Sequence, residues 1–257
     1  ENINKYKINV VILAAGQGVR MKCDLPKVLL EVRGKPMIER LLWAVQKSGV
    51  DDKPIIVVGY KKEEVINRLG DKYEYVVQEE QLGTGHAVIS AEKILKNNAA
   101  HILVLYGDSP FLSSKTIKEL VNRHLKSGVK ITMATVKLPD FANSRAFFYK
   151  SFSRIVRDKN GKIVKDVQFR DASEEEKKIK EVNPCYFIFE TKWLWEKLKT
   201  LNTNNKQKQY YLTDLVERAI EEGTKIESIK INPQEALAAN SKEELEILEK
   251  LAPQSNF

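Results

Sequence analysis

The stretch that decides the fold is VVILAAGQGVRMKCDLPK, residues 10–27. Its apolar start at residues 10–13 is typical of a buried strand, and the alanines and glycines at residues 14–18 predict a loop of bare backbone. Arg20 and Lys27 follow just beyond the glycines. Main-chain amides that point inward, together with cations, suit a polyphosphate, so we expect a phosphate-binding loop here.

The composition is that of a globular protein with a sizeable core. The chain has 257 residues, of which 42% are hydrophobic and 30% charged, enough for one large domain or two small ones. The 43 Lys and Arg residues exceed the 35 Asp and Glu residues, which gives a net charge of +8. Because the lysines are interspersed with glutamates, as on solvated helix faces, we expect no nucleic-acid partner, although the charge can help to gather anionic substrates.

The cysteines and the hydropathy bear on the cellular compartment. Cys23 and Cys185 lie far apart, without a CxxC motif or a Cys/His cluster, which favours a reduced, intracellular protein. No apolar run approaches the roughly 20 residues that span a bilayer, and the opening ENINKYKIN lacks the apolar core of a signal peptide. We therefore expect a cytoplasmic location and no membrane partner.

Apolar runs and amphipathic segments alternate along the first half of the chain. After the first strand, the pattern predicts helices at residues 35–48, 62–69, 87–95 and 114–127, and strands at residues 55–58, 75–77, 102–106 and 131–136. Such alternation favours right-handed βαβ units and a parallel sheet.

The character changes after residue 138. Asn160-Gly161 between alternating apolar residues predicts a β-hairpin, and Ser173 with Glu176 predicts the capping box of a short helix. Residues 182–189 are expected to form one strand, interrupted by Asn183-Pro184. Further helices are expected at residues 193–198, from about Thr213 and after Ser241, with a last strand at residues 225–231. The sequence thus predicts one α/β domain with a β-rich insertion.

Two further segments carry polar residues where a strand ends. In QEEQLGTGH, residues 78–86, Gln78 could pair with a base edge through both its carbonyl and its amide, and Thr84 could serve as helix N-cap or ligand donor; a plain N-cap turn is the alternative. Asp108 ends the most apolar strand, where open α/β sheets place their ligands, so it is a candidate Mg²⁺ ligand. Turns also favour Gly-Asp without any ligand.

Several spaced motifs resemble those of one family, the sugar-nucleotide nucleotidyltransferases. They are LAAGQGVRM followed by LPKVLLEVRGKPMI, then QLGTGHA, LYGDSP and QYYLTD, and the resemblance covers residues 10–248. Within the family, they most resemble the uridyltransferase domain of bifunctional bacterial enzymes that make UDP-N-acetylglucosamine. The resemblance implies a Rossmann-like three-layer α/β fold with a mostly parallel central sheet. It also implies one domain over residues 1–257, with a nucleotide-binding half at about 8–137, a sugar-binding half at about 138–232 and a helical segment at 233–257.

The resemblance also implies roles for particular residues, with UTP and a sugar 1-phosphate as substrates and Mg²⁺ as cofactor. Arg20 and Lys27 would act on the phosphates as the catalytic cations, and Asp108 and Asn240 would bind Mg²⁺. The other implied contacts are Leu13, Ala14, Ala15 and Gly16 to the nucleotide, Gln78, Gly83 and Thr84 to the uracil, and Asn183, with the aligned positions Ser153 and Gln168, to the sugar. N-acetylglucosamine 1-phosphate is the leading acceptor substrate. The protein could also form a homo-oligomer.

This sequence departs from the family pattern at four positions. Val19 replaces a threonine of the glycine loop, and Gln209 replaces a glutamate before the paired tyrosines. In the sugar pocket, Ser153 replaces a glycine and Gln168 a glutamate. Since an amide both donates and accepts hydrogen bonds where a carboxylate only accepts, the sugar hydroxyls that are recognised can differ. The departures leave the transfer chemistry intact and the sugar open.

Other functional classes fit the sequence less well. A nicotinamide-binding dehydrogenase would need a third glycine and a later acidic residue, and no GxxxxGK[ST] motif of a P-loop NTPase is present. The presence of Arg20, Lys27, Asp108 and Asn240 argues against a sugar-nucleotide-binding protein without turnover, since a pure binder has less need for metal ligands. Transfer to another sugar 1-phosphate or from another nucleoside triphosphate remains an alternative. Whether the chain stands alone or is a piece of a longer protein is also open.

Overall fold

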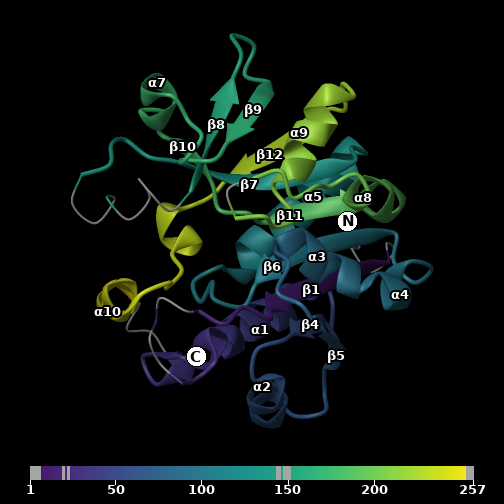
Figure 1. The fold of residues 1–257 in the computed structure, drawn as a ribbon, viewed down its shortest axis with the longest axis vertical. Coiled ribbons are helices and arrows are strands. Elements are labelled where there is room, and N and C mark those ends of the chain that lie inside the picture. The colour runs from purple at the N-terminus through teal and green to yellow at the C-terminus, as the bar shows by residue number, and fades with distance from the viewer. Residues whose placement is uncertain are drawn as a thin grey trace.

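The fold is built around strand β1 (Ile8–Ala14), the middle of a parallel sheet (Figure 1). The computed structural model describes residues 7–18, 21, 24–142, 146, 152–205 and 207–252. Strands β4 (Ile55–Val58) and β6 (His101–Tyr106) pair with β1 in parallel on its two sides, and β5 (Glu74–Val77) pairs in parallel with β4. The predicted βαβ alternation of the first half is therefore confirmed.

Beyond β6 the sheet takes in later parts of the chain. Strand β11 (Phe187–Glu190) lies antiparallel between β6 and β7 (Ile131–Lys137), and β12 (Ile226–Lys230) pairs in parallel with β7. The central sheet is thus mostly parallel, as predicted. Strand β11, which follows β6 by more than eighty residues, thus lies between β6 and β7, two strands that are consecutive in the sequence.

The β-rich insertion is a small antiparallel extension of this sheet. Strands β8 (Ser153–Arg157) and β9 (Ile163–Val167) form the predicted hairpin, whose turn places Gly161 at a φ of +80°, and β10 (Glu181–Asn183) joins β8 to β7. The capping box is also confirmed: it opens helix α7 (Glu174–Lys177).

The single strand predicted at residues 182–189 is wrong, because the chain breaks there into β10 and β11. Cys185 adopts a left-handed φ of +66° directly after Asn183-Pro184, and proline lacks the N–H that a continuous ladder would need. The break lets β10 pair with β7 and β8 while β11 pairs with β6 and β7. The turn at Asn183 therefore lies where the antiparallel extension joins the central part of the sheet.

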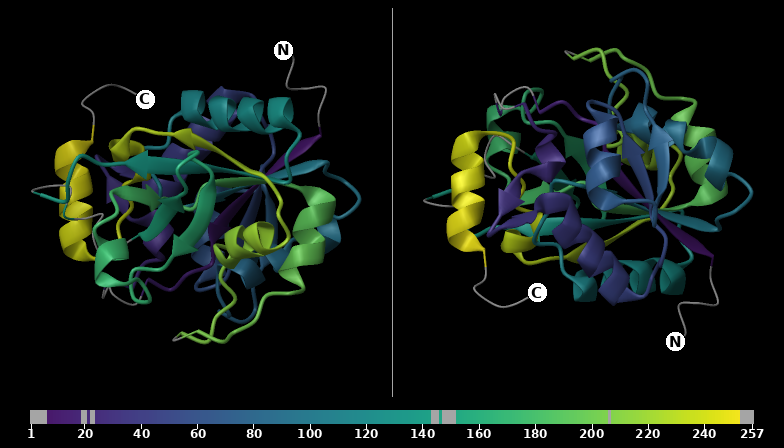
Figure 2. Two further views of the ribbon diagram at one scale, coloured as in Figure 1. Left: turned by 90° about the horizontal axis from the view of Figure 1, so that it is seen from above. Right: turned by 90° about the horizontal axis from the view of Figure 1, so that it is seen from below.

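Helices cover both faces of the central sheet, as Figure 2 shows, and this confirms the three-layer expectation. Successive residues of β1 point to opposite faces: Val10 and Ile12 belong to one core with helices α1 (Met37–Ser48) and α5 (Ser114–Ser127). Val11 and Leu13 belong to a second core with the helices α3 (Thr84–Ser90), α8 (Thr191–Leu198) and α9 (Asp214–Glu221).

The remaining elements are short or peripheral. They are η3 (Lys27–Leu29), β2 (Glu31–Val32), β3 (Lys35–Pro36), α2 (Lys62–Leu69), α4 (Glu92–Leu95), η5 (Pro233–Ala236) and α10 (Lys242–Leu251). Ser241 caps α10 as predicted, since its hydroxyl accepts from the Glu244 N–H. None of the described helices has both the length and the apolar character needed to cross a bilayer.

Candidate functional site

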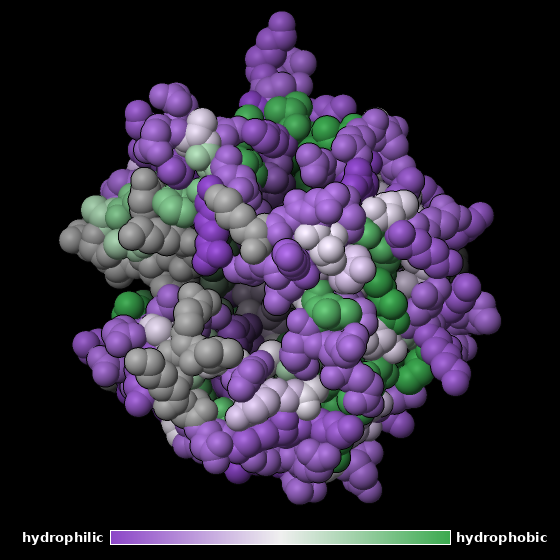
Figure 3. Space-filling view, in the orientation of Figure 1, coloured by the Kyte–Doolittle hydropathy of each residue, from purple (hydrophilic) through white to green (hydrophobic). Residues whose placement is uncertain are grey.

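A cavity of about 460 Å³ lies at the carboxyl ends of β1, β5 and β6. Figure 3 shows that the molecule is hollowed near the middle of the face it presents and that hydrophilic residues dominate that face. The cavity brings together ten of the predicted residues: Leu13, Ala14, Ala15, Gly16, Lys27, Gln78, Gly83, Thr84, Asp108 and Asn240. Arg20, like Val19, lies outside the described residues.

The glycine loop after β1 forms one wall of the cavity. A Cβ at Gly16 would meet no atom within 4 Å, so this position leaves open space beside the backbone. Gly18 has a φ of +62°, and a Cβ there would lie 2.9 Å from the Cβ of Lys27. The loop therefore needs glycine at position 18 both for its left-handed backbone and for the close approach of Lys27.

Lys27, Asp108 and Asn240 meet at the edge of the cavity. The Lys27 ammonium donates to Asn240 Oδ1 at 2.8 Å and forms an ion pair with Asp108 Oδ2. These residues come from η3, from the end of β6 and from the segment before α10. The oxygens of Asp108 and Asn240 thus contact the same ammonium group, although the three residues lie far apart in the sequence.

The same oxygens fit a divalent cation in kind. A carboxylate and an amide carbonyl are hard donors of the type that Mg²⁺ takes, and Mg²⁺ commonly completes its shell with water and substrate phosphates. No cluster of three or more His, Cys, Asp or Glu side chains suited to a metal occurs among the described residues.

The buried side chain of Gln78 is committed to its own loop. Its amide nitrogen lies 3.1 Å from the Gly83 carbonyl oxygen, to which it donates, and 3.0 Å from His86 Nδ1. In this arrangement the amide nitrogen already has partners, so pairing of a base with both the carbonyl and the amide would require these contacts to change. Only the carbonyl oxygen can be offered to a ligand without breaking these contacts.

Residues 82–85 are held by the later QYYLTD motif. The Tyr210 N–H donates to the Leu82 carbonyl at 2.8 Å, and the Gly85 N–H donates to the Tyr210 carbonyl at 2.8 Å. A Cβ at Gly83 would lie 2.6 Å from the Tyr210 carbonyl oxygen, and Gly83 has a φ of +107°. Only glycine fits this crossing, which explains why the two motifs occur together.

Thr84 is neither the N-cap of its helix nor pointed solely at a ligand. The N-cap of α3 is Gly83, and Thr84 Oγ1 accepts from the Leu212 N–H at 2.9 Å. The N-cap interpretation of this threonine is therefore wrong. The hydroxyl is used to hold the later segment, which sequence reasoning on residues 78–86 alone did not anticipate.

The positions that the resemblance assigns to the sugar lie on or directly beside the small antiparallel extension and do not line this cavity. Asn183 is fully buried: its Nδ2 donates to Asp166 Oδ2 at 2.7 Å, and its Oδ1 accepts from the Cys185 N–H at 2.7 Å. Ser153 is paired in register with Asn183. Gln168 donates from Nε2 to Thr213 Oγ1 at 3.1 Å, so its amide is already bound to the start of α9.

Sequence reasoning missed Asp166 and the neighbours that link it to the cavity. Burial raises the pKa of Asp166 to about 6, an effect that the Ser153 and Asn183 side chains offset in part. Burial, with the nearby Asp166 and Asp108 carboxylates, raises the pKa of the Cys185 thiol. Asp166 could have been found from the predicted hairpin, because it lies on β9 two residues before Gln168. No local signal points to Cys185.

Fold and site together define a class of protein. A profile of the MobA-like NTP transferase domain matches residues 10–218. The chain belongs to this family of nucleotidyltransferases.

The curated relatives are longer proteins. The bifunctional protein GlmU of Acetivibrio thermocellus is 42% identical over 238 residues, which cover 91% of this chain and 49% of that protein. GlmU of Thermoanaerobacter pseudethanolicus is 41% identical over 241 residues, 94% of this chain and 50% of that protein. The chain thus spans about half the length of the curated relatives it matches.

Solved structures with low identity share the fold. A Bacillus anthracis protein assigned as a glucose-1-phosphate thymidylyltransferase, solved with sucrose, has a TM-score of 0.77 at 18% identity, covering 97% of each chain. A UDP-glucose pyrophosphorylase solved with UDP-glucose has a TM-score of 0.75 at 17% identity, covering 95% of this chain and 97% of that one. At such identities the likeness supports the Rossmann-like nucleotidyltransferase fold alone.

Proposed function

We propose that the protein transfers UMP from UTP to a sugar 1-phosphate, with Mg²⁺, to give a UDP-sugar and pyrophosphate. The observation that carries the proposal is the convergence of Lys27, Asp108 and Asn240 on one cavity with the glycine loop and Gln78. N-acetylglucosamine 1-phosphate is the acceptor we propose first, because the motifs most resemble uridyltransferases that use it. Family membership supports the nucleotidyl transfer.

The two halves of the chain divide the binding. Residues 8–137 would hold the nucleotide, with Leu13 to Gly16 along it and the loop at Gln78, Gly83 and Thr84 beside the uracil. Residues 138–232 would hold the sugar at Ser153, Gln168 and Asn183. Residues 233–257 would close the domain, and they contribute Asn240 to the candidate metal site.

Asp108 and Asn240 would hold the Mg²⁺ ion. When bound there, the ion would neutralise part of the charge on the triphosphate, which phosphoryl transfer needs more than covalent help from the protein. The Lys27 ammonium can then turn from these two oxygens to a phosphate. Lys27, with Arg20 in the same loop region of the sequence, would stabilise the charge that develops on the transferred group.

The chemistry requires no general base. The sugar 1-phosphate is already an anion, so one of its oxygens can form the new bond to the α-phosphorus of UTP. The bond between the α-phosphorus and the bridging oxygen breaks, and pyrophosphate leaves with the electron pair. The protein's part is to align the two phosphates and to balance their charge.

Pyrophosphate release from a matrix of nucleoside triphosphates and sugar 1-phosphates, with Mg²⁺ present, tests the proposal. Release with UTP and N-acetylglucosamine 1-phosphate is the expected result. Release with UTP and a different sugar would keep the reaction and correct the acceptor, and release with another nucleotide would correct the uracil assignment. No release from any pair would favour a binding protein without turnover.

A further inference from the structure

One face of the small antiparallel sheet carries polar side chains only partly used by the protein. The register pairs Asp166 with Ile155 on β8 and Asn183 with Ser153. Because side chains alternate along strands, Ser153, Asp166 and Asn183 share one face.

Two buried oxygens on this face lack a hydrogen bond. They are Ser153 Oγ and Asp166 Oδ1, neither of which has a partner at hydrogen-bonding geometry among the described residues. The Ser153 hydroxyl is nevertheless close enough to Asp166 to lower the pKa of that carboxyl. Ser153 is 3% exposed, and the other oxygen of Asp166 is used by Asn183. Since folded proteins rarely bury a hydroxyl or a carboxylate oxygen unpaired, two such oxygens side by side indicate a place for a ligand that donates hydrogen bonds.

This face is continuous with the candidate site. Asn183 and Cys185 stand at the turn between β10 and β11, and the Cys185 thiol is close enough to both Asp166 and Asp108 to feel their charge. Tyr106, which lines the cavity, is in turn near Cys185 and Asp108. Cys185 is therefore a neighbour of both the carboxylate at the candidate site and the carboxylate on this face.

The charges nearby favour a neutral donor. Asp214 of α9 is close enough to Asp166 to act on its charge, and Asp108 and Asp166 both act on Cys185. The amide nitrogen of Gln168 donates to Thr213. A sugar hydroxyl donates one hydrogen bond to a carboxylate and can share a second with a serine hydroxyl. We propose that Asp166 selects the sugar 1-phosphate: its Oδ1 accepts a hydrogen bond from one ring hydroxyl, and Ser153 makes the second contact. This proposal rests on the proposed function.

The variant Asp166→Asn tests this selection. It keeps an oxygen that can accept from Asn183 Nδ2 but removes the anionic acceptor. We expect the KM for the sugar 1-phosphate to rise about 10- to 100-fold while the KM for UTP stays unchanged, since a hydrogen bond to a charged group is lost. Asp158→Asn, the same change in the exposed hairpin turn of the same sheet, is the matched control and should behave as the wild type.

Single-deoxy sugar 1-phosphates identify the hydroxyl. One deoxy analogue should lose efficiency with the wild type, yet be used equally well as the parent sugar by Asp166→Asn, because the lost contact is the same. If every analogue loses the same factor in both proteins, or if Asp166→Asn has wild-type kinetics, Asp166 does not read the sugar. If circular dichroism shows that Asp166→Asn is unfolded, Ser153→Ala is tested with the same analogues instead.

The two proposals fail in different ways. Absence of pyrophosphate release from every nucleotide and sugar pair with the wild type overturns both. Release by the wild type, with no dependence on Asp166 or Ser153 for any sugar, overturns the selection alone and leaves the transfer reaction in place.

Discussion

Among single residues, Lys27 is the side chain that joins the parts of the site. It contacts Asp108 after β6 and Asn240 before α10, and its side chain packs beside Gly18 in the loop after β1. The ammonium group balances the charge of the Asp108 carboxylate, and under the proposed function it would bind a phosphate.

Replacing Lys27 by Ala should therefore reduce turnover by about 10²- to 10³-fold, the usual cost of removing one transition-state stabilising group. Steady-state pyrophosphate release measures the effect, and circular dichroism checks that the fold is kept. Lys53→Ala, at an exposed position, is the control and should have normal turnover. Near-normal turnover of Lys27→Ala would remove this residue from the catalytic groups.

A second residue-scale property is a histidine pair on the α5 side of the sheet. His124, 1% exposed, lies 3.1 Å from His101 between the ring nitrogens Nε2 and Nδ1, and its Nδ1 is 2.9 Å from Thr132 Oγ1. Burial, and then the neighbouring His101, lowers the pKa of His124 to about 3. The folded protein thus keeps this imidazole neutral well below pH 6.5.

The free energy of unfolding should consequently fall with acidification. The unfolded chain takes up a proton at His124 near pH 6.5 and the folded one only near pH 3, so the stabilising contribution is complete above pH 6.5 and is lost as the pH falls. Between pH 7 and pH 5 the loss from this group is about 2 kcal/mol. Urea unfolding at both pH values measures it, and His124→Gln should show a shallower dependence; an equal dependence in both proteins would contradict the assignment.

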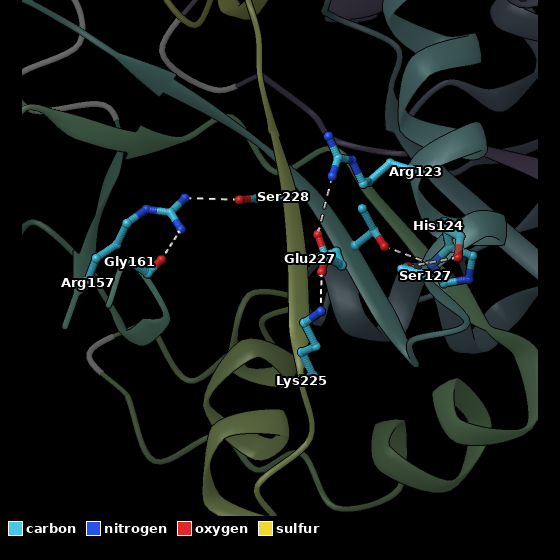
Figure 4. Close-up of polar contacts among 9 residues, drawn as sticks. Arg123, His124, Ser127, Arg157, Gly161, Lys225, Glu227 and Ser228 are labelled. Atoms are coloured by element: carbon cyan, nitrogen blue, oxygen red, sulfur yellow. Dashed lines mark hydrogen bonds and ion pairs between the residues drawn. The ribbon is translucent and has the colours of Figure 1, made fainter. Parts of the chain in front are cut away.

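At the scale of elements, Arg157 fastens the hairpin to the central sheet. Its guanidinium forms two bonds to the Glu181 carboxylate, at 2.9 and 2.7 Å, and also donates to the Gly161 carbonyl and Ser228 Oγ. Figure 4 shows Arg157 reaching across to Ser228 on β12. The hairpin turn, β10 and β12 are thereby held by one side chain.

Arg157→Ala should destabilise the protein by about 3 kcal/mol, because Glu181 is left largely buried without its cation. Arg123 in α5 offers a matched control: it is half-exposed, and its ion pair with Glu227, also drawn in Figure 4, is 3.8 Å long. Arg123→Ala should cost less than about 1 kcal/mol. Urea denaturation compares the two, and equal losses would show that the network around Arg157 does not hold the hairpin.

Local signals in the sequence predicted most elements but not their breaks. The glycine loop, the Asn160-Gly161 hairpin and the Ser173 capping box each follow from neighbouring residues and appear as predicted. The separation of β10 from β11 depends on which strands lie alongside, and the role of Thr84 depends on Leu212. Neither partner lies near in the sequence, so neither feature could be predicted locally.

At the scale of the whole molecule, the parallel sheet sets where ligands can bind. The carboxyl ends of β1, β5 and β6 meet at one edge, which predicted that Asp108 would lie near the glycine loop. No hydrophobic periodicity in the sequence predicts that Asn240 lies at the same edge of the sheet. It was predicted by resemblance alone, as were the sugar positions, while Asp166 was not predicted at all.

The measurement that tests the central claim most directly is pyrophosphate release from UTP and sugar 1-phosphate by the wild type and by Asp108→Ala, each with Mg²⁺ and with a chelator. We predict release by the wild type with Mg²⁺ only, and none by Asp108→Ala under either condition although its circular dichroism spectrum is unchanged. Equal release by Asp108→Ala, or release by the wild type in the chelator, would contradict a metal-assisted transfer at this site.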